Sequence, residues 1–291
     1  MKISDPGAEV IHAATQGDLA ALDAVLLAIQ PGVFNLAVRM LGNREDAADA
    51  TQEILLKVVT HLGGFRREAA FTTWVFQVAR NHLLTAATRI KESPEVSLEG
   101  MAQRLQSGLD FAVTSEQASS PSVLTPEDKL AARQVALSCT QGMLMALGRE
   151  QRLVYLLDIV FHLPSTQAAQ VLDITPEAYR QRLSRARAQL DAFTGNTCGL
   201  ASEQAACRCE KQLPALQHLR RRGAPHSPSV AALHRSERAE AGGRFDALVR
   251  MGDAASLMRA HPEYQVPESL RGAIRAVLRA EGYWPDDTPL Q

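Results

Sequence analysis

Apolar residues recur at every third or fourth position along most of this chain, which is the spacing of an amphipathic helix. The first such run includes Leu22, Val25, Leu26 and Ile29, and the pair Pro31-Gly32 predicts a break after it. A second run reaches Gly42-Asn43. Two more follow, one ending at a glycine pair and one that a threonine at 72 or 73 can cap. The pattern predicts a helical block over residues 8–90.

A second helical block is expected over residues 126–193, after a Ser- and Pro-rich linker at 91–125. The signal Thr125-Pro126-Glu127-Asp128 predicts its first helix start. Residues 194–291 form an extension that returns to helix near 239–259 and 268–281. The expected fold is therefore all-α, with two small helical domains joined by a flexible linker and followed by a mostly helical C-terminal extension.

Composition narrows the class of protein. Aromatic residues make up 5% of the chain and the formal net charge is -1, so the general basic excess of many nucleic-acid-binding proteins is absent. The N-terminus lacks the pattern of a signal peptide, and the apolar runs look too short to span a membrane. Four cysteines in a chain of this length do not make a secreted disulfide scaffold. We expect a soluble cytoplasmic protein with no membrane partner.

Positive charge gathers locally on the last helix of the second block. Residues 165–190 predict two short helices joined by a tight turn, and the second carries Arg180, Arg182, Arg185 and Arg187 without an acidic residue from 179 to 189. This pattern is typical of a helix-turn-helix whose second helix lies against duplex DNA. The alternative is a solvated basic face on an ordinary helical hairpin.

The helical spacing also assigns faces to this helix. Arg180, Gln181, Ser184 and Arg187 are expected to face outward, with Arg182 and Arg185 to the side as contacts for backbone phosphates. The planar guanidinium of arginine can pair with phosphates or with guanine edges. The expected contacts to duplex DNA are Thr175, Glu177, Arg180, Gln181, Arg182, Ser184, Arg185 and Arg187.

Two motif sets resemble the sigma-70 family of bacterial RNA polymerase sigma factors, in its extracytoplasmic-function (ECF) group. The first block reads DAADATQE over 46–53, FR over 65–66, FTTW over 71–74 and ARN over 79–81, as in region 2 of that family. The second block resembles region 4, including the RLSRAR ending over 182–187. Both matches occur in family order.

The resemblance implies a promoter-recognition protein without catalytic activity, whose partners are core RNA polymerase and promoter DNA, with an anti-sigma factor as a further expected partner. It implies that the first block docks on the polymerase clamp through Asp46, Asp49, Gln52, Glu53 and Leu56. It also implies that the downstream promoter element contacts Phe65, Arg66, Arg67, Trp74, Arg80 and Asn81. From the residues alone, the acidic helix face is equally a solvated face, and Trp74 fits a core position better than a stacking one.

Some positions depart from the family pattern. Thr85 stands where an Asp is common, and Asp173 replaces the usual glycine of the turn, where Asp tolerates a left-handed conformation. The run 160–163 is unusually apolar, and packing on the C-terminal extension would account for it.

The extension opens with Cys198, Cys207 and Cys209, a spacing unlike a standard zinc knuckle. A zinc site completed by Cys139 or His218, a redox-sensitive thiol pair and no ligand chemistry all remain open. No cofactor is expected, apart from the zinc ion that these cysteines leave as an open alternative.

Two rival functions also remain open. One is a helix-turn-helix regulator that binds duplex DNA without polymerase, and the other is a sigma-like interaction protein that does not open promoters. No phosphate-binding loop or nucleophile motif favours an enzyme.

Overall fold

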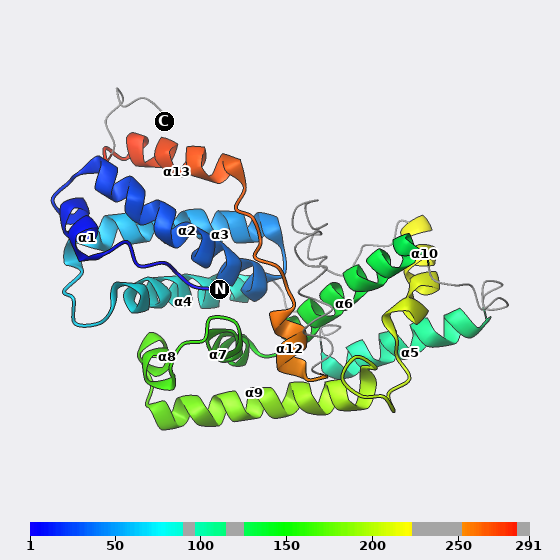
Figure 1. Cartoon of the computed structure of the whole chain (residues 1–291). Helices are drawn as coiled ribbons and strands as arrows, with labels where there is room; N and C mark the ends of the chain where they lie inside the picture. The colour runs from blue at the N-terminus through cyan, green and yellow to red at the C-terminus, as the bar shows by residue number, and fades with distance from the viewer. Residues whose placement is uncertain (90–96, 115–124, 223–251, 284–291) are drawn as a thin grey trace.

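The computed structural model describes residues 1–89, 97–114, 125–222 and 252–283, and the regular structure in these ranges is helical (Figure 1). The first block comprises α1 (Ala8–Thr15), α2 (Leu19–Leu41), α3 (Arg44–His61), the short 3-10 turn η1 (Leu62–Gly64) and α4 (Phe71–Arg89). The second comprises α6 (Pro126–Ala146), α7 (Arg149–Ile159), α8 (Ser165–Leu172) and α9 (Pro176–Thr197). The expectation of an all-α fold is confirmed.

Helix α2 is continuous, so the predicted break at Pro31-Gly32 is wrong. The N-terminal segment packs against the helix at this point, where a Cβ on Gly32 would lie 2.6 Å from Ile3 Cγ1. The side chain of Asn35 donates to the Pro31 carbonyl at 2.9 Å. Packing against the N-terminal segment and the rest of the core therefore holds together a helix that a proline would weaken in isolation.

The same helix is long and apolar enough to cross a membrane, contrary to the sequence expectation, which had divided it in two. Two thirds of its most apolar window, 67%, is buried inside the protein. Figure 1 shows it at the centre of the first block, between α13 and α4. The burial is that of a central core helix.

Helix boundaries in the first block follow local signals, with one exception. Gly42 ends α2 in the left-handed conformation, and the Asn43 side chain accepts from the Glu45 amide to begin α3. Helix α4 begins at Phe71, before both threonines that were expected to cap it. Thr73 is instead buried inside the helix, where it contacts the second block.

The second block begins and turns as predicted. Thr125 and Asp128 form a reciprocal capping box at the start of α6. Asp173 adopts the left-handed conformation (φ 54°, ψ 48°) between α8 and α9, and Thr175 caps α9 with Pro176 at its first position. The backbone of a helix-turn-helix is therefore formed.

Two segments differ from the sequence expectation. The linker contains a helix, α5 (Leu98–Thr114), which packs on the 3-10 turn η3 (Cys209–Gln212) and on α10 (Leu213–Arg221). The extension continues with α12 (Ala254–Arg259) and α13 (Glu268–Ala280). Of the helix expected over 239–259, residues 252 and 253 precede α12, with Asp253 as its cap, and residues 239–251 lie outside the described residues.

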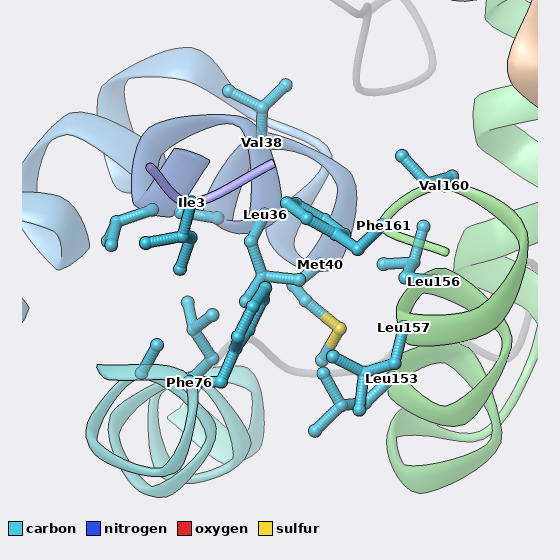
Figure 2. Close-up of a cluster of buried hydrophobic side chains, with 14 of the residues drawn as sticks. Ile3, Leu36, Val38, Met40, Phe76, Leu153, Leu156, Leu157, Val160 and Phe161 are labelled. Carbon is cyan, nitrogen blue, oxygen red and sulfur yellow. The ribbon is translucent and has the colours of Figure 1, made fainter. Parts of the chain in front are cut away.

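The two blocks share one hydrophobic core (Figure 2). Met40 of α2 points toward Leu153 and Leu157 of α7, whereas Phe76 of α4 rises toward Leu36 and Phe161. The rings of Phe76 and Phe161 meet edge to face with centroids 5.3 Å apart. The apolar run at 160–163 therefore packs on the first block at Phe161, and its expected packing on the extension stays a prediction.

A buried arginine reinforces this junction. Arg152 of α7 is 1% exposed, and its guanidinium donates to the carbonyls of Leu144, Met145 and Leu147 at the end of α6. It also donates to the Met40 carbonyl at 2.5 Å. One side chain thus satisfies carbonyls at the ends of two helices, one from each block.

Candidate nucleic-acid interface

The outward face of α9 is open to solvent. A shallow hollow on it is lined by Glu177, Arg180, Gln181, Ser184 and Arg185, all of them exposed. The opposite face carries Tyr179, Leu183 and Ala186, which are buried. The helix therefore presents two arginines among small and polar side chains, which is suited to entry into a DNA groove.

The arginines divide differently from the prediction. Arg187 was expected outward, but it pairs with Asp158 of α7 at 2.5 Å, because its position on α9 lies toward α7. Arg182 pairs with Glu150 of α7 at 2.8 Å. Arg185, expected to the side, lines the outward hollow with Arg180.

Tyr179 holds α9 in position against α7. Its hydroxyl donates to the Val154 carbonyl at 3.3 Å, and its ring is fully buried. Burial raises the pKa of this phenol well above its ordinary value. The side chain thus acts as a neutral hydrogen-bonded anchor between α9 and α7.

The acidic face of α3 is exposed at Asp46, Asp49 and Glu53, while Gln52 and Leu56 are half-buried. Helix α13 packs along α3 (Figure 1). A band of carboxylates therefore remains accessible on the helix that the sequence assigns to polymerase docking.

The loop before α4 is built on three aromatic rings. Phe65, Phe71 and Trp74 have ring centroids 5.4 to 5.7 Å apart, and Trp74 is half-buried. The interpretation of Trp74 as a packing residue agrees with this cluster. Arg66 and Arg67 are exposed on the loop beside it, and Arg67 has a positive φ of 58°.

Arg80 and Asn81 lie on different sides of α4. Asn81 is exposed, whereas the guanidinium of Arg80 donates to the Val171 carbonyl of α8 at 3.3 Å. The structure therefore places one expected single-strand contact in solvent and the other against the helix-turn-helix.

The four cysteines, Cys139 on α6 and three more within residues 198–209, lie near η3. Cys198 and Cys207 pair through an isolated β-bridge, and the Gln212 amide donates to Cys207 Sγ at 3.5 Å. Burial, with the neighbouring thiols, raises the pKa of Cys139, and burial raises that of Cys209 to about 12. Thiols held protonated in this way are poor nucleophiles.

Among the described residues, no group of three or more His, Cys, Asp or Glu side chains is arranged to hold a metal ion. His218, considered as a further ligand, instead lies against the Phe111 ring with centroids 4.8 Å apart. The zinc hypothesis gains no support from this arrangement.

Sequence reasoning missed a buried polar group on α2. Asn35 and Arg39 are 2% and 1% exposed, and both bind the backbone of the extension near Tyr264. Two polar residues four positions apart within the apolar run 33–41 were the available signal. Their partners lie more than 220 residues away, so spacing alone does not find them.

Family comparison accounts for both blocks. The model of "Sigma-70 region 2" matches residues 26–92, and that of "Sigma-70, region 4" matches residues 137–190. This chain belongs to the sigma-70 family. The extension lies beyond both matched ranges, so family membership describes the two blocks and leaves α12 and α13 to be interpreted from the structure.

Several proteins with sequences similar to this sigma-70 family member are sigma factors. RNA polymerase sigma-H factor of Pseudomonas aeruginosa is 32% identical over 89 residues, covering 29% of this chain and 46% of the relative. ECF RNA polymerase sigma factor SigW of Bacillus subtilis is 25% identical over 60% of this chain and 89% of its own length. ECF RNA polymerase sigma-E factor of Escherichia coli K12 is 25% identical over 62% and 91%. The match to sigma-H thus spans less than half of that protein.

Proposed function

We propose that this chain is an ECF-type sigma factor that binds core RNA polymerase, recognises promoter DNA and directs transcription initiation in the cytoplasm. The observation that carries the proposal is the occurrence of both sigma-70 regions in family order, with the outward face of α9 open to solvent. Polymerase would supply the chemistry, and this chain would supply recognition and strand opening.

Each surface has a proposed role. The exposed carboxylates of α3 dock on a basic surface of polymerase, with Gln52 and Leu56 at the edge of the contact. The loop residues Arg66 and Arg67, with Asn81 and Arg80, meet single-stranded DNA, where basic side chains track phosphates. The α9 face reads duplex DNA in the major groove.

The test is reconstitution of the full chain with core polymerase, followed by run-off transcription on genomic fragments. Promoter-dependent transcripts are expected. A folded chain that binds duplex DNA but yields no transcript, and forms no complex with core enzyme, would favour the regulator without polymerase instead.

A charge-reversal pair tests the docking surface. The double variant Asp49→Lys with Glu53→Lys is expected to weaken binding to core polymerase at least about tenfold. Two carboxylates that would face the basic docking surface become positive charges, which that surface repels. Glu9→Lys on α1 is the matched control, because Glu9 is also an exposed acidic helix residue. Equal loss in both proteins would argue against a docking role for α3.

A further inference from the structure

We propose that the free chain is held closed by its C-terminal extension, so that the helix-turn-helix covers one face of α4 while the DNA-reading face of α9 stays open. The effect of this closure on DNA binding rests on the proposed function. The closed chain can bind duplex DNA through α9, but it cannot present all of α4 to single-stranded DNA.

The covered face of α4 is a single stripe. Thr73, Gln77, Arg80 and Leu84 are spaced four, three and four residues apart, which places them on one side of the helix. Three of the four bind α8 or the residues beside it through side chains: Thr73 accepts from Gln167, Gln77 donates to the Gln170 carbonyl and Arg80 donates to that of Val171.

The fourth position of the stripe is also engaged. The Leu84 carbonyl accepts from Arg149 at the start of α7, at 3.4 Å. The opposite side of α4, at Val75, Ala79 and Leu83, is buried in the core with the other helices of the first block. The stripe is therefore an interface between blocks, and Thr73 is 1% exposed where Gln167 of α8 contacts it.

The extension connects the two blocks on the other side of the molecule. We call residues 253–264, which include α12, the strap. Asn35 of α2 accepts from the Tyr264 amide at 2.7 Å and donates to the Tyr264 carbonyl at 2.9 Å. Arg39 donates to the Pro262 carbonyl at 3.0 Å and lies over the Tyr264 ring. These contacts attach the strap to the first block.

The strap is attached to the second block through His261 and α12. His261 is 2% exposed, with Nε2 2.5 Å from Thr140 Oγ1 of α6 and Nδ1 2.7 Å from the Tyr264 hydroxyl. Helix α12 packs on α6, α7 and α9 (Figure 1). A segment bound to α2 on one side and α6 on the other opposes separation of the blocks.

In the closed form one candidate DNA-binding surface is exposed and the other is partly covered. Arg180 and Arg185 on α9 are exposed, whereas Arg80 on α4 is committed to a backbone carbonyl of α8. Opening of the interface would release Arg80, uncover Thr73 and Gln77, and expose the part of the shared core at which Phe76 meets Phe161. The exposed loop arginines Arg66 and Arg67 need no such release.

The test measures exposure of the stripe in the full-length chain. The substitution Thr73→Cys introduces a thiol at the interface, and its alkylation by iodoacetamide is followed by mass spectrometry at each cysteine separately. Slow reaction is expected in the otherwise unchanged chain. Adding Thr140→Val is expected to raise the rate a few-fold, because it leaves buried His261 without its α6 partner.

A stronger variant and a control complete the series. Thr140→Arg places a large charged group beside the strap and Arg39, and it is expected to raise the rate about tenfold or more, since the charge reaches water only when the strap leaves α6. Thr114→Arg on the exposed end of α5 is the matched control and should leave the rate unchanged. Unfolding would be recognised by faster reaction at the four native cysteines as well.

Two outcomes overturn the closure. One is alkylation of Thr73→Cys in the full chain at the rate of an unfolded control, and the other is a folded Thr140→Arg variant with no gain in rate. A third arm adds core polymerase. If core polymerase also raises the alkylation rate at Thr73→Cys, the closed chain opens on assembly. If Thr140→Arg raises the rate but polymerase does not, the closure is supported and the proposed polymerase function is not.

Discussion

At the residue scale, the structure assigns different tasks to side chains that look alike in the sequence. The four arginines of α9 are equivalent by composition. Arg182 and Arg187 are held in ion pairs with α7, while Arg180 and Arg185 face the open side of the helix. An arginine already paired with a carboxylate contributes less to the attraction of a phosphate.

Salt dependence of duplex binding tests this division. Arg180→Ala with Arg185→Ala is expected to reduce the slope of log K against log salt by about 2, or roughly 0.9 for each phosphate that is no longer neutralised. Arg182→Ala with Arg187→Ala should change the slope by less, because those charges are partly neutralised by Glu150 and Asp158. Fluorescence anisotropy over a salt series measures both, and equal slopes would contradict the division.

His261 gives a second prediction at this scale. Burial, together with Arg39, lowers its pKa to about 3. The unfolded histidine titrates near its ordinary value of about 6.5 and so binds protons that the folded one does not. Stability contributed by neutral His261 is therefore present above pH 6.5 and is lost as the pH falls below that value.

The expected loss between pH 7.5 and 5.5 is about 1.4 kcal/mol in the free energy of unfolding, one factor of ten in the equilibrium. Urea unfolding of the full chain at both pH values measures it, with His261→Gln as the reference protein. Loss of equal size in the two proteins would show that His261 is not the titrating group.

At the element scale, helix ends with a local cap were predicted, whereas the continuity of α2 and the start of α4 were not. The turn at Asp173 and the caps at Thr125 and Thr175 depend on neighbouring residues, so the sequence contains their full cause. Continuity of α2 through Pro31 and the start of α4 depend on packing against distant segments. Arg187 is exposed, as expected, but its ion pair with Asp158 was not predicted, because a helical period does not say where a neighbouring carboxylate lies.

The cap of α9 provides a prediction at this scale. Thr175→Ala is expected to lower the free energy of unfolding by about 1 kcal/mol, since the Ala178 amide loses its side-chain acceptor. Thr175→Ser is the matched control and should retain most of that stability. Thermal or urea denaturation compares the two, and identical stabilities would mean that the cap contributes nothing.

At the scale of the whole molecule, the two blocks and the extension form one folded unit around a shared core (Figure 2). The sequence predicted both blocks and the proposed binding surfaces of each. It did not predict their contact, because the residues that join them, such as Arg152 and Met40, are separated by 112 positions. The spacing of apolar residues within one helix does not predict a contact between residues so far apart in the sequence.

Arg152 provides the prediction for this scale. Arg152→Leu is expected to cost about 3 kcal/mol or more, because several buried carbonyls lose a charged donor at once. Arg149→Leu is the control, since Arg149 is a neighbouring arginine of the same helix with a longer 3.4 Å bond to the Leu84 carbonyl. Calorimetry of the full chain measures both, and equal small losses would contradict the role of Arg152 at the junction.

The strap follows both sigma regions along the chain, and this order matters during synthesis. A ribosome completes the residues of α2, α4 and α9 before it makes Asp253 to Tyr264. The emerging protein therefore passes through a stage at which each block can fold but the strap does not yet join them. A product that ends before Asp253 would carry both DNA-facing regions without the strap, and only the shared core and Arg152 would then oppose their separation.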